Sequence, residues 1–445
     1  MYVFCSFQMK KLINIISLQN TMLTKEQLKQ ILVSQRETIL KKDYGIERTI
    51  LKDIKAKMIL PHVIVITGIR RSGKSTFLKQ IIEKYYHNKN FYYINFEDER
   101  LFNFEASQFN EIYESLIDLY GECKTFFIDE IQNIPHFETF VRRFYEQGFK
   151  FYLTGSSASL LSKELGTKLT GRHVDIVVKP FSFTEFLALK HITVNTQDLY
   201  RTETRVKIKK LFETYLIKGG MPEYLLHDDL ELLMNIYDDI LIKDIAVRYH
   251  IENVTTLKQI YQYLVNNFSN KFSYNDIKKI LKIGSVNTVK KYISHLEETH
   301  FASTIAKFDH SIKKQLINDK KMYLVDTGFI QILSTRLTKD KGWLLENVVY
   351  TTLKKLITDV FYFSDKKECD FIVMEKKSIC SIIQVTWELN ENNKEREIEG
   401  LLSAMNFFSI KSGLILTFDQ EEEFTREKKK ILVKPVWKWL LEQEK

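Results

Sequence analysis

The sequence predicts an α/β fold built on a parallel sheet that carries helices on both faces. A β-favouring run, Val63 to Thr67, leads into the pattern Gly-x-x-x-x-Gly-Lys-Ser at Gly68 to Ser75, and an apolar-periodic helix follows. A second apolar run ends in Asp129 and Glu130, about 55 residues after the lysine of the first pattern. Strands and helices alternate around these points, which indicates a P-loop NTPase sheet with helices on both faces.

Each residue type in the first pattern has a role in phosphate binding. Glycines at both ends of the loop permit close approach and positive φ, so that backbone N–H groups can wrap the phosphates. Lys74 places a charge on the β- and γ-phosphates, the Ser75 hydroxyl ligates Mg²⁺, and the helix from about Thr76 points its positive dipole end at the anion. The residues expected to contact this magnesium triphosphate are Gly68, Arg70, Arg71, Ser72, Gly73, Lys74, Ser75 and Thr76.

Polar side chains also end the other predicted strands. Asp129 is expected to hold Mg²⁺, directly or through water, and Glu130 to act as the general base on the attacking water. Asn95 either senses the γ-phosphate or holds the catalytic acid; the alternative is a plain loop asparagine. Thr154 and Ser156 are the candidates for a hydroxyl that contacts the γ-phosphate or positions water.

Further segments flank this core. Thr24 precedes a run in which Leu28, Ile31 and Leu32 share one face, which predicts a capped helix packed on the sheet. Arg172 either stabilises transition-state charge, in cis or in trans from a neighbouring subunit, or forms a surface salt bridge. The expected parts are an N-terminal helical lead-in (1–45), the P-loop core (46–180), a helical lid (181–254), a winged helix-turn-helix (255–325) and a small α/β domain (326–445).

Residues 255–320 are strongly basic, with eleven lysines and five acids. Ser285 is expected to cap a helix from Val286 to Glu298, which follows a shorter helix and a turn and precedes two β-favouring runs. This order predicts a winged helix-turn-helix. Its second helix presents Asn287, Lys290 and Lys291, the candidates for contact with duplex DNA; packing or contact with a partner protein is the alternative use.

The last part reads as α/β again. A helix carries Glu346, and two later strands carry Asp370 and Gln384; these oxygen-bearing side chains are expected to converge as the ligands of a divalent metal do. Gln384 is a poorer ligand than a carboxylate, and Thr386 supplies no positive charge. A structural or vestigial site is therefore favoured.

Composition is that of a globular chain: 445 residues, 44% hydrophobic and 28% charged, with a net charge of +9 that suits a polyanion partner without requiring one. The cysteines are scattered without a C-x-x-C pair, which predicts reduced thiols and no zinc site. We expect no signal peptide and no membrane span, hence a cytoplasmic protein, with Met1 and Met22 as alternative starts. The cysteines are Cys5, Cys123, Cys369 and Cys380.

Seven motifs together resemble one family. They are Gly68–Ser75, Asn95–Asp98, Phe127–Gln132, Leu153–Ser157, Leu169–Arg172, Gly219–Pro222 and Lys321–Gly328. The chain resembles, over about residues 40–445, the AAA+-type ATPases of archaea and bacteria in which a domain of unknown function follows, combining a winged helix with a restriction-endonuclease-like fold.

The resemblance implies ATP with Mg²⁺ at the loop, Asn95 and Ser156 in sensing positions, and a nuclease-like site at Glu346, Asp370, Gln384 and Thr386. Gln-Val-Thr replaces the acid-x-Lys of such nucleases, so the fold is expected and the cleavage is not. We therefore predict a Mg²⁺-dependent ATPase that acts as a nucleotide-driven switch on its C-terminal module, alone, as a homo-oligomer or with a partner protein. The alternatives are an ATP-dependent DNA nuclease and a non-catalytic module that binds nucleic acid or protein under the control of ATP.

Overall fold

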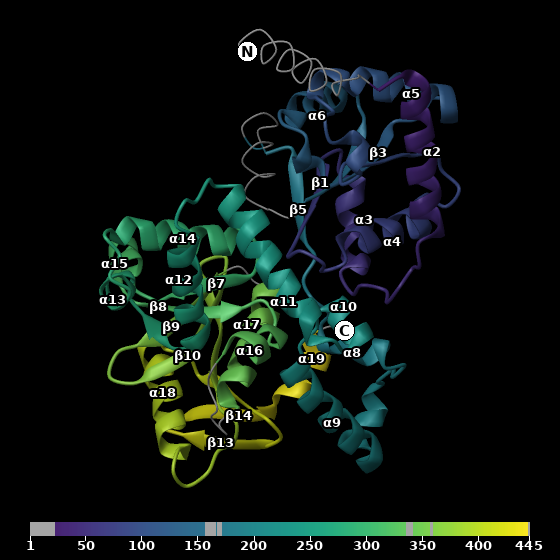
Figure 1. The fold of residues 1–445 in the computed structure, drawn as a ribbon. Helices are drawn as coiled ribbons and strands as arrows, with labels where there is room; N and C mark the ends of the chain where they lie inside the picture. The colour runs from purple at the N-terminus through teal and green to yellow at the C-terminus, as the bar shows by residue number, and fades with distance from the viewer. Residues whose placement is uncertain (1–22, 156–165, 167–170, 335–340, 357–358, 444–445) are drawn as a thin grey trace.

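The computed structural model describes residues 23–155, 166, 171–334, 341–356 and 359–443. One sheet lies in the N-terminal part and a second, larger sheet in the C-terminal part, and helices of residues 183–247 run between them (Figure 1). None of the helices within these ranges combines the length and the apolar character that crossing a lipid bilayer requires.

The first sheet has five parallel strands in the order β2-β3-β4-β1-β5. Every residue of its central strand β1 is buried, because helices cover both faces. α2, α5 and α6 pack on one face, and α3 and α4 on the other. The predicted doubly covered parallel sheet is therefore confirmed. The elements are α2 (Lys25–Lys41), α3 (Leu51–Ile59), β1 (Val63–Thr67), α4 (Lys74–Tyr86), β2 (Tyr92–Asn95), α5 (Phe109–Tyr120), β3 (Thr125–Asp129), α6 (Phe137–Glu146), β4 (Lys150–Thr154) and β5 (His173–Val177).

Helix α2 begins as predicted. Thr24 Oγ1 accepts a hydrogen bond from the backbone N–H of Gln27 at 3.2 Å, and the Gln27 side chain accepts one from the backbone N–H of Thr24 at 2.9 Å. Leu28, Ile31 and Leu32 are buried against the sheet. The lead-in helix is thus part of the core of the first sheet.

The helical segment after the first sheet divides between two cores. α8 and α9 pack with helices of the C-terminal part, whereas α10, α11 and the π-helical η5 pack with residues 257–344 and with one residue of the glycine loop, Ile69. The helices of the expected lid therefore pack into two different hydrophobic clusters. The elements are α8 (Phe183–Leu189), η4 (Thr196–Tyr200), α9 (Thr202–Lys218), α10 (Pro222–His227), α11 (Leu230–Asp239) and η5 (Ile240–Val247).

Four helices and a small antiparallel sheet of order β6-β8-β7 follow in the described residues. Ser285 Oγ accepts from the backbone N–H of Asn287 and caps α14, while Val289, Ile293 and Leu296 are buried on the inner face of that helix. The two expected helices and the paired strands are present. The elements are α12 (Val254–Asn266), β6 (Lys271–Phe272), α13 (Tyr274–Ile280), α14 (Val286–Glu298), β7 (Ala302–Ala306), α15 (Ile312–Ile317) and β8 (Lys320–Leu324).

The C-terminal sheet is mixed, with six strands in the order β13-β14-β12-β11-β10-β9. α18 packs on one face, and α17 and α19 on the other. The elements are α16 (Gly328–Leu333), α17 (Gly342–Leu356), β9 (Asp359–Ser364), β10 (Glu368–Glu375), β11 (Ser378–Val385), α18 (Lys394–Phe407), β12 (Ser412–Thr417), β13 (Glu422–Arg426), β14 (Lys429–Pro435) and α19 (Val436–Gln443).

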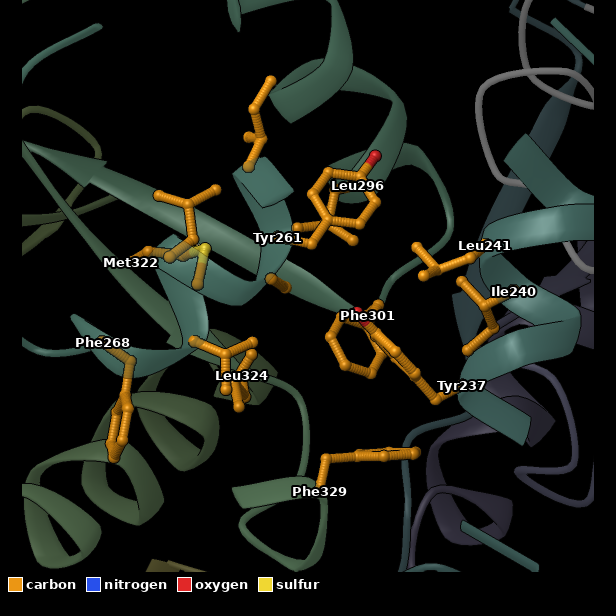
Figure 2. Packing of buried hydrophobic residues seen from close by; sticks show 14 of the residues in the cluster. Tyr237, Ile240, Leu241, Tyr261, Phe268, Leu296, Phe301, Met322, Leu324 and Phe329 are labelled. Atoms are coloured by element: carbon orange, nitrogen blue, oxygen red, sulfur yellow. The ribbon is translucent and has the colours of Figure 1, made fainter. Parts of the chain in front are cut away.

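A hydrophobic cluster connects these parts. Figure 2 shows Tyr237 of α11 beside Phe301, with Phe329 of α16 below them. The ring centroids of Tyr237 and Phe301 lie 5.6 Å apart, and those of Phe301 and Phe329 lie 4.9 Å apart. Ile69 belongs to the same cluster and is fully buried. The loop after β1 is thus packed into a core built mostly from residues 221–344.

Candidate nucleotide-binding site

The loop between β1 and α4 needs its two glycines. Gly68 has φ of 145°, and a Cβ on it would lie 2.1 Å from the carbonyl oxygen of Val178. Gly73 has φ of 93° and directly precedes α4. A residue with a side chain would be strained at either position. The loop conformation is therefore set by the sequence, with the N-terminus of α4 facing the space beyond β1.

Two side chains of the loop make few or only long hydrogen bonds within the described residues. Lys74 Nζ donates only long hydrogen bonds, 3.3 Å to each of the carbonyl oxygens of Gly68 and Ile69. Ser72 Oγ is buried, and no hydrogen-bond partner lies within reach among the described residues. A buried hydroxyl without a partner is uncommon, and a phosphate oxygen would satisfy it. The loop as built thus fits a phosphate group.

The two acids lie at the carboxyl edge of the sheet. Asp129 ends β3, directly paired with Asn95 at the end of β2, and is 2% exposed. Its Oδ1 accepts a hydrogen bond from Thr154 Oγ1, and the same Thr154 oxygen accepts from the backbone N–H of Glu130 at 2.9 Å. Gln132 Nε2 donates to Glu130 Oε2 at 2.5 Å. β4 therefore holds both acids in place through one hydroxyl group.

A cavity of about 540 Å³ joins the loop to the second acid. Lys74, Ser75 and Thr76 line it on one side and Glu130 on the other, with Glu97 also at its wall. The structure thus brings together residues predicted from two motifs far apart in the sequence. The size is sufficient for a phosphate chain with a metal ion.

Asn95 lies beside the loop cavity and lines a neighbouring one. Its side chain accepts a hydrogen bond from the backbone N–H of Glu97 at 2.9 Å, and its backbone is held by Gln35 of α2. It lines a neighbouring cavity of about 300 Å³, and Glu97 lines both cavities. The predicted candidate is therefore next to the loop cavity, with its amide oxygen already engaged.

Arg172 lies at the opposite edge of the sheet. Its carbonyl oxygen accepts from the N–H of Val63, the first residue of β1, and its side chain is exposed, 5.9 Å from the ring of Tyr145. β1 runs for five residues, so the two edges lie roughly 16 Å apart at about 3.3 Å per residue. The prediction that Arg172 contacts a phosphate bound to the same chain is therefore wrong. Ser156 falls outside the described residues.

The loop arginines bind acids of the helical segment. Arg70 donates to both carboxylate oxygens of Asp244 in η5, at 3.2 and 3.0 Å, and Arg71 donates to Glu223 in α10 at 2.7 Å. Burial lowers the pKa of Arg70, but the hydrogen bond and charge of Asp244 outweigh it and raise that pKa. Sequence reasoning gave these arginines to the nucleotide and did not find their acidic partners, which lie 174 and 152 residues further on.

A second polar cluster lies in the C-terminal half and brings the predicted trio together. Lys321 of β8 is at its centre: its Nζ lies 3.1 Å from Glu346, 2.8 Å from Glu368 and 3.1 Å from Asp370. Gln384 Oε1 accepts from the backbone N–H of Asp370 at 3.3 Å. Thr386 supplies no charge, as expected, and the positive charge of the site comes instead from Lys321 of an earlier strand, which the sequence analysis did not identify.

The cluster lies on a cleft of about 1100 Å³. Burial lowers the pKa of Lys321, but the surrounding carboxylates, Glu346 first, outweigh burial and raise it far above its usual value. Burial and the charge of Asp370 raise the pKa of Glu346 to about 7. Across the part of the chain that the structure describes, no group of three or more histidine, cysteine, aspartate or glutamate side chains is placed to hold a metal ion.

The residues predicted for DNA contact are on the outer face of α14. Asn287, Lys290 and Lys291 are exposed, and the Nζ of Lys290 lies 5.5 Å from the ring of Tyr274. The helix therefore offers a polar, basic face to solvent.

Comparison with known proteins gives the class. The AAA domain family matches residues 61–187, the part that holds the parallel sheet and its glycine loop, and a domain of unknown function, DUF8612, matches residues 209–340. Residues 61–187 thus have a P-loop NTPase fold of the AAA class.

Two relatives extend the comparison. "Uncharacterized protein MJ1544" of Methanocaldococcus jannaschii is 34% identical over 415 residues, 88% of this chain and 91% of that protein. An "Uncharacterized protein" of Haemophilus influenzae is 30% identical over 348 residues, 75% and 84% of the two chains. The chain belongs to the family that these proteins form. A solved structure of AMPPCP-bound DnaA from Aquifex aeolicus covers 58% of this chain and 92% of its own at 16% identity, with a TM-score of 0.26, too low to inform the fold.

Proposed function

We propose that the chain binds ATP with Mg²⁺ in the loop cavity and hydrolyses it. One observation carries the proposal: Lys74 and Glu130, from two separate motifs, line one cavity beside a loop whose Ser72 hydroxyl has no partner. A phosphate would take the N–H groups of the loop and the charge of Lys74. Membership of the AAA class agrees with a nucleotide as the ligand.

The remaining roles follow from position. Ser75 and Asp129 would hold Mg²⁺, which, when bound, neutralises charge on the phosphates. Glu130, oriented by Gln132, would accept the proton of the attacking water. Asn95 and Ser156 keep the sensing roles predicted for them.

Arg172 would act only in trans. It lies at the edge of the sheet away from the loop cavity, so that it could meet a triphosphate only on another copy of the chain. Stabilisation of transition-state charge by such an arginine is worth roughly 10³-fold or more in other NTPases. This part of the proposal requires a homo-oligomer during turnover.

The nucleotide would act as a switch through the loop arginines. Arg70 and Arg71 are bound to Asp244 and Glu223 on η5 and α10, which in turn pack against residues 257–344. A triphosphate would compete with these carboxylates for the same guanidinium groups. Nucleotide state would thereby alter how the helical segment is held against the loop.

The test is ATP turnover by the wild-type chain, Glu130→Gln and the matched control Glu97→Gln. Glu97 is an exposed acid at the wall of the same cavity. We expect turnover to fall in Glu130→Gln alone, with ATP affinity retained. Equal turnover in Glu130→Gln and the wild type would remove Glu130 from the mechanism.

Duplex DNA is the second candidate ligand. The order α12-β6-α13-α14-β7-α15-β8 supports the predicted winged helix of residues 255–325, with a short helix between its last two strands, and α14 exposes Asn287, Lys290 and Lys291. Stimulation of ATP turnover by duplex DNA would support this role. We retain the five predicted parts as a proposal, with residues 326–445 as a nuclease-like fold whose cleavage activity Lys321 disfavours.

A further inference from the structure

Three carboxylates from two elements surround one ammonium group. Glu346 comes from α17, and Glu368 and Asp370 come from β10, where a register irregularity follows Cys369. The Lys321 side chain is 3% exposed, and its Nζ lies between 2.8 and 3.1 Å from one oxygen of each. An ammonium has three N–H donors and no acceptor, so three carboxylate oxygens satisfy it completely.

We propose that Glu346, Glu368 and Asp370 form a cation site that the chain fills with its own Lys321, and that this lysine excludes hard divalent cations from the cleft. Carboxylate oxygens are the ligands that such cations take. The ammonium lies within 3.1 Å of one oxygen of each carboxylate, so a metal ion bound by all three would have to take its place.

Neighbouring groups fix the carboxylates in this arrangement. Tyr323 donates its hydroxyl to Glu346 Oε1 at 2.6 Å, and the backbone N–H of Val385 donates to Asp370 Oδ2 at 3.0 Å. Gln384 is held in turn by Glu397 at 2.6 Å. Glu346 and Asp370 are therefore held by groups other than Lys321, and Glu368 also pairs with Lys271 at 2.5 Å. As they stand, the three carboxylates are not placed to hold a metal ion, so an ion that replaced the ammonium would draw their oxygens closer.

The cluster differs from an ion pair sealed in a core because it opens to solvent. It lines the cleft of about 1100 Å³, together with Trp343 and Trp387. An ion can reach the carboxylates once Lys321 is removed or withdrawn. Lys321 belongs to β8, so withdrawal in the native chain would require a shift of the small sheet relative to β10.

The experiment uses the full chain without nucleotide and terbium(III), a hard, oxygen-seeking ion whose emission tryptophan sensitises at short range. Trp343 and Trp387 serve as the donors. We compare the wild type with Lys321→Met, which removes the charge and keeps the length of the side chain. Lys320→Met is the matched control, because it makes the same change at the preceding residue of β8. Lys320 Nζ donates to the Gln315 carbonyl oxygen instead of to the carboxylates.

We expect sensitised emission from Lys321→Met at terbium concentrations at least about 100-fold below those that give any signal in the wild type or in Lys320→Met, because a full charge is removed from within about 4 Å of the ion. Adding Asp370→Asn to Lys321→Met abolishes the signal. Mn²⁺ competes for the site and lowers the emission.

Two results overturn the proposal. One is a folded Lys321→Met chain, with the far-ultraviolet circular dichroism of the wild type, that binds terbium no better than Lys320→Met. The other is measured on chains that keep Lys321, so it does not depend on whether Lys321→Met folds. If the wild type gives sensitised emission at low terbium and Asp370→Asn removes that emission, Lys321 does not exclude the ion. Both readouts are independent of ATP turnover, so failure here leaves the proposed ATPase untouched.

Discussion

Replacing Arg48 by methionine tests how the nucleotide loop is held. Arg48 is 5% exposed and donates from three nitrogens: Nη1 to the carbonyl oxygen of Ser72 at 2.8 Å, Nε to Glu185 Oε1 at 3.1 Å, and Nη2 to the carbonyl oxygen of Lys179. One side chain thus connects the segment before α3, the loop, the chain just after β5 and α8.

The expected loss in the free energy of unfolding comes from the Glu185 carboxylate, which the substitution leaves without its arginine partner. Glu185 is 3% exposed, and removing one partner of a buried ion pair costs about 3–5 kcal/mol because the other charge remains buried. The backbone N–H groups of Thr49 and Ser182 still donate to Glu185, at 2.7 and 2.9 Å. We therefore expect a loss of about 3 kcal/mol in the free energy of unfolding, the low end of that range. Arg48→Met combined with Glu185→Gln should recover part of it, because the uncompensated charge is gone.

The assay is urea unfolding followed by circular dichroism at two pH values. In the wild type, burial raises the pKa of Glu185, but the charges of Arg48 and Lys355 and two backbone N–H groups together outweigh burial and lower it. The carboxylate therefore stabilises the folded chain above its unfolded pKa, and this stability is lost as the pH falls. Without Arg48 the largest of these lowering effects is lost, so the pKa rises and the stabilisation at high pH decreases. The destabilisation should therefore be smaller near pH 5 than near pH 8.

A matched control is Arg142→Met. Arg142 pairs with Glu146 on the surface of α6, where both side chains are 52% exposed, and its loss should cost less than about 0.5 kcal/mol. A change below about 1 kcal/mol in Arg48→Met, or an equal change at both pH values, would refute the reasoning.

Four further outcomes are expected. Lys74→Ala should raise the Kd for ATP roughly 10- to 100-fold by isothermal titration calorimetry, since a hydrogen bond to a charged group is worth about 1.5–3 kcal/mol; an unchanged Kd contradicts the loop assignment. Glu130→Gln should lower single-turnover hydrolysis about 10²- to 10⁴-fold with ATP affinity retained, and loss of binding instead would indicate a structural role. Lys290→Glu with Lys291→Glu should weaken duplex binding and reduce the slope of log K against log salt by about 2; an unaltered slope excludes phosphate contact there. Burial raises the pKa of Asp326 to about 6, so its stabilising contribution is present at low pH and lost as the pH rises from about 4 through about 6; Asp326→Asn should flatten the dependence of the melting temperature on pH in that range, and an unchanged slope would contradict the raised pKa.

Local patterns predicted the first sheet and its loop. Gly68 and Gly73 are required by φ and by a close carbonyl oxygen, so the motif specifies its own conformation. Asp129 and Asn95 were placed at one edge by the rule that parallel strands end together, and the strand pairing agrees. The same rule locates Arg172, because a residue that precedes a parallel strand lies at the other edge; the signal was present in the sequence and was not used.

Contacts between distant segments could not be read in the same way. Lys321 and Asp370 are 49 residues apart, and their hydrogen bond depends on how β8 lies against β10. Only one local feature of the sequence pointed to this contact. Lys321 lies two residues before Tyr323 in a β-favouring run, so the side chains of Lys321 and Tyr323 share one face of the strand. The pairing of Arg70 with Asp244, like the division of the lid into two groups, depends on tertiary packing that period and propensity do not encode.

The burial of Ile69 has a mechanical consequence. Its neighbours in the chain wrap the proposed triphosphate, while its own side chain is locked among rings and aliphatic groups contributed by the other half of the molecule. Close-packed interiors transmit small displacements rather than absorb them. A rearrangement of a few tenths of an ångström at the phosphates would therefore extend beyond the loop, because the residues of 221–344 that pack in the same cluster as Ile69 must move with it or oppose it.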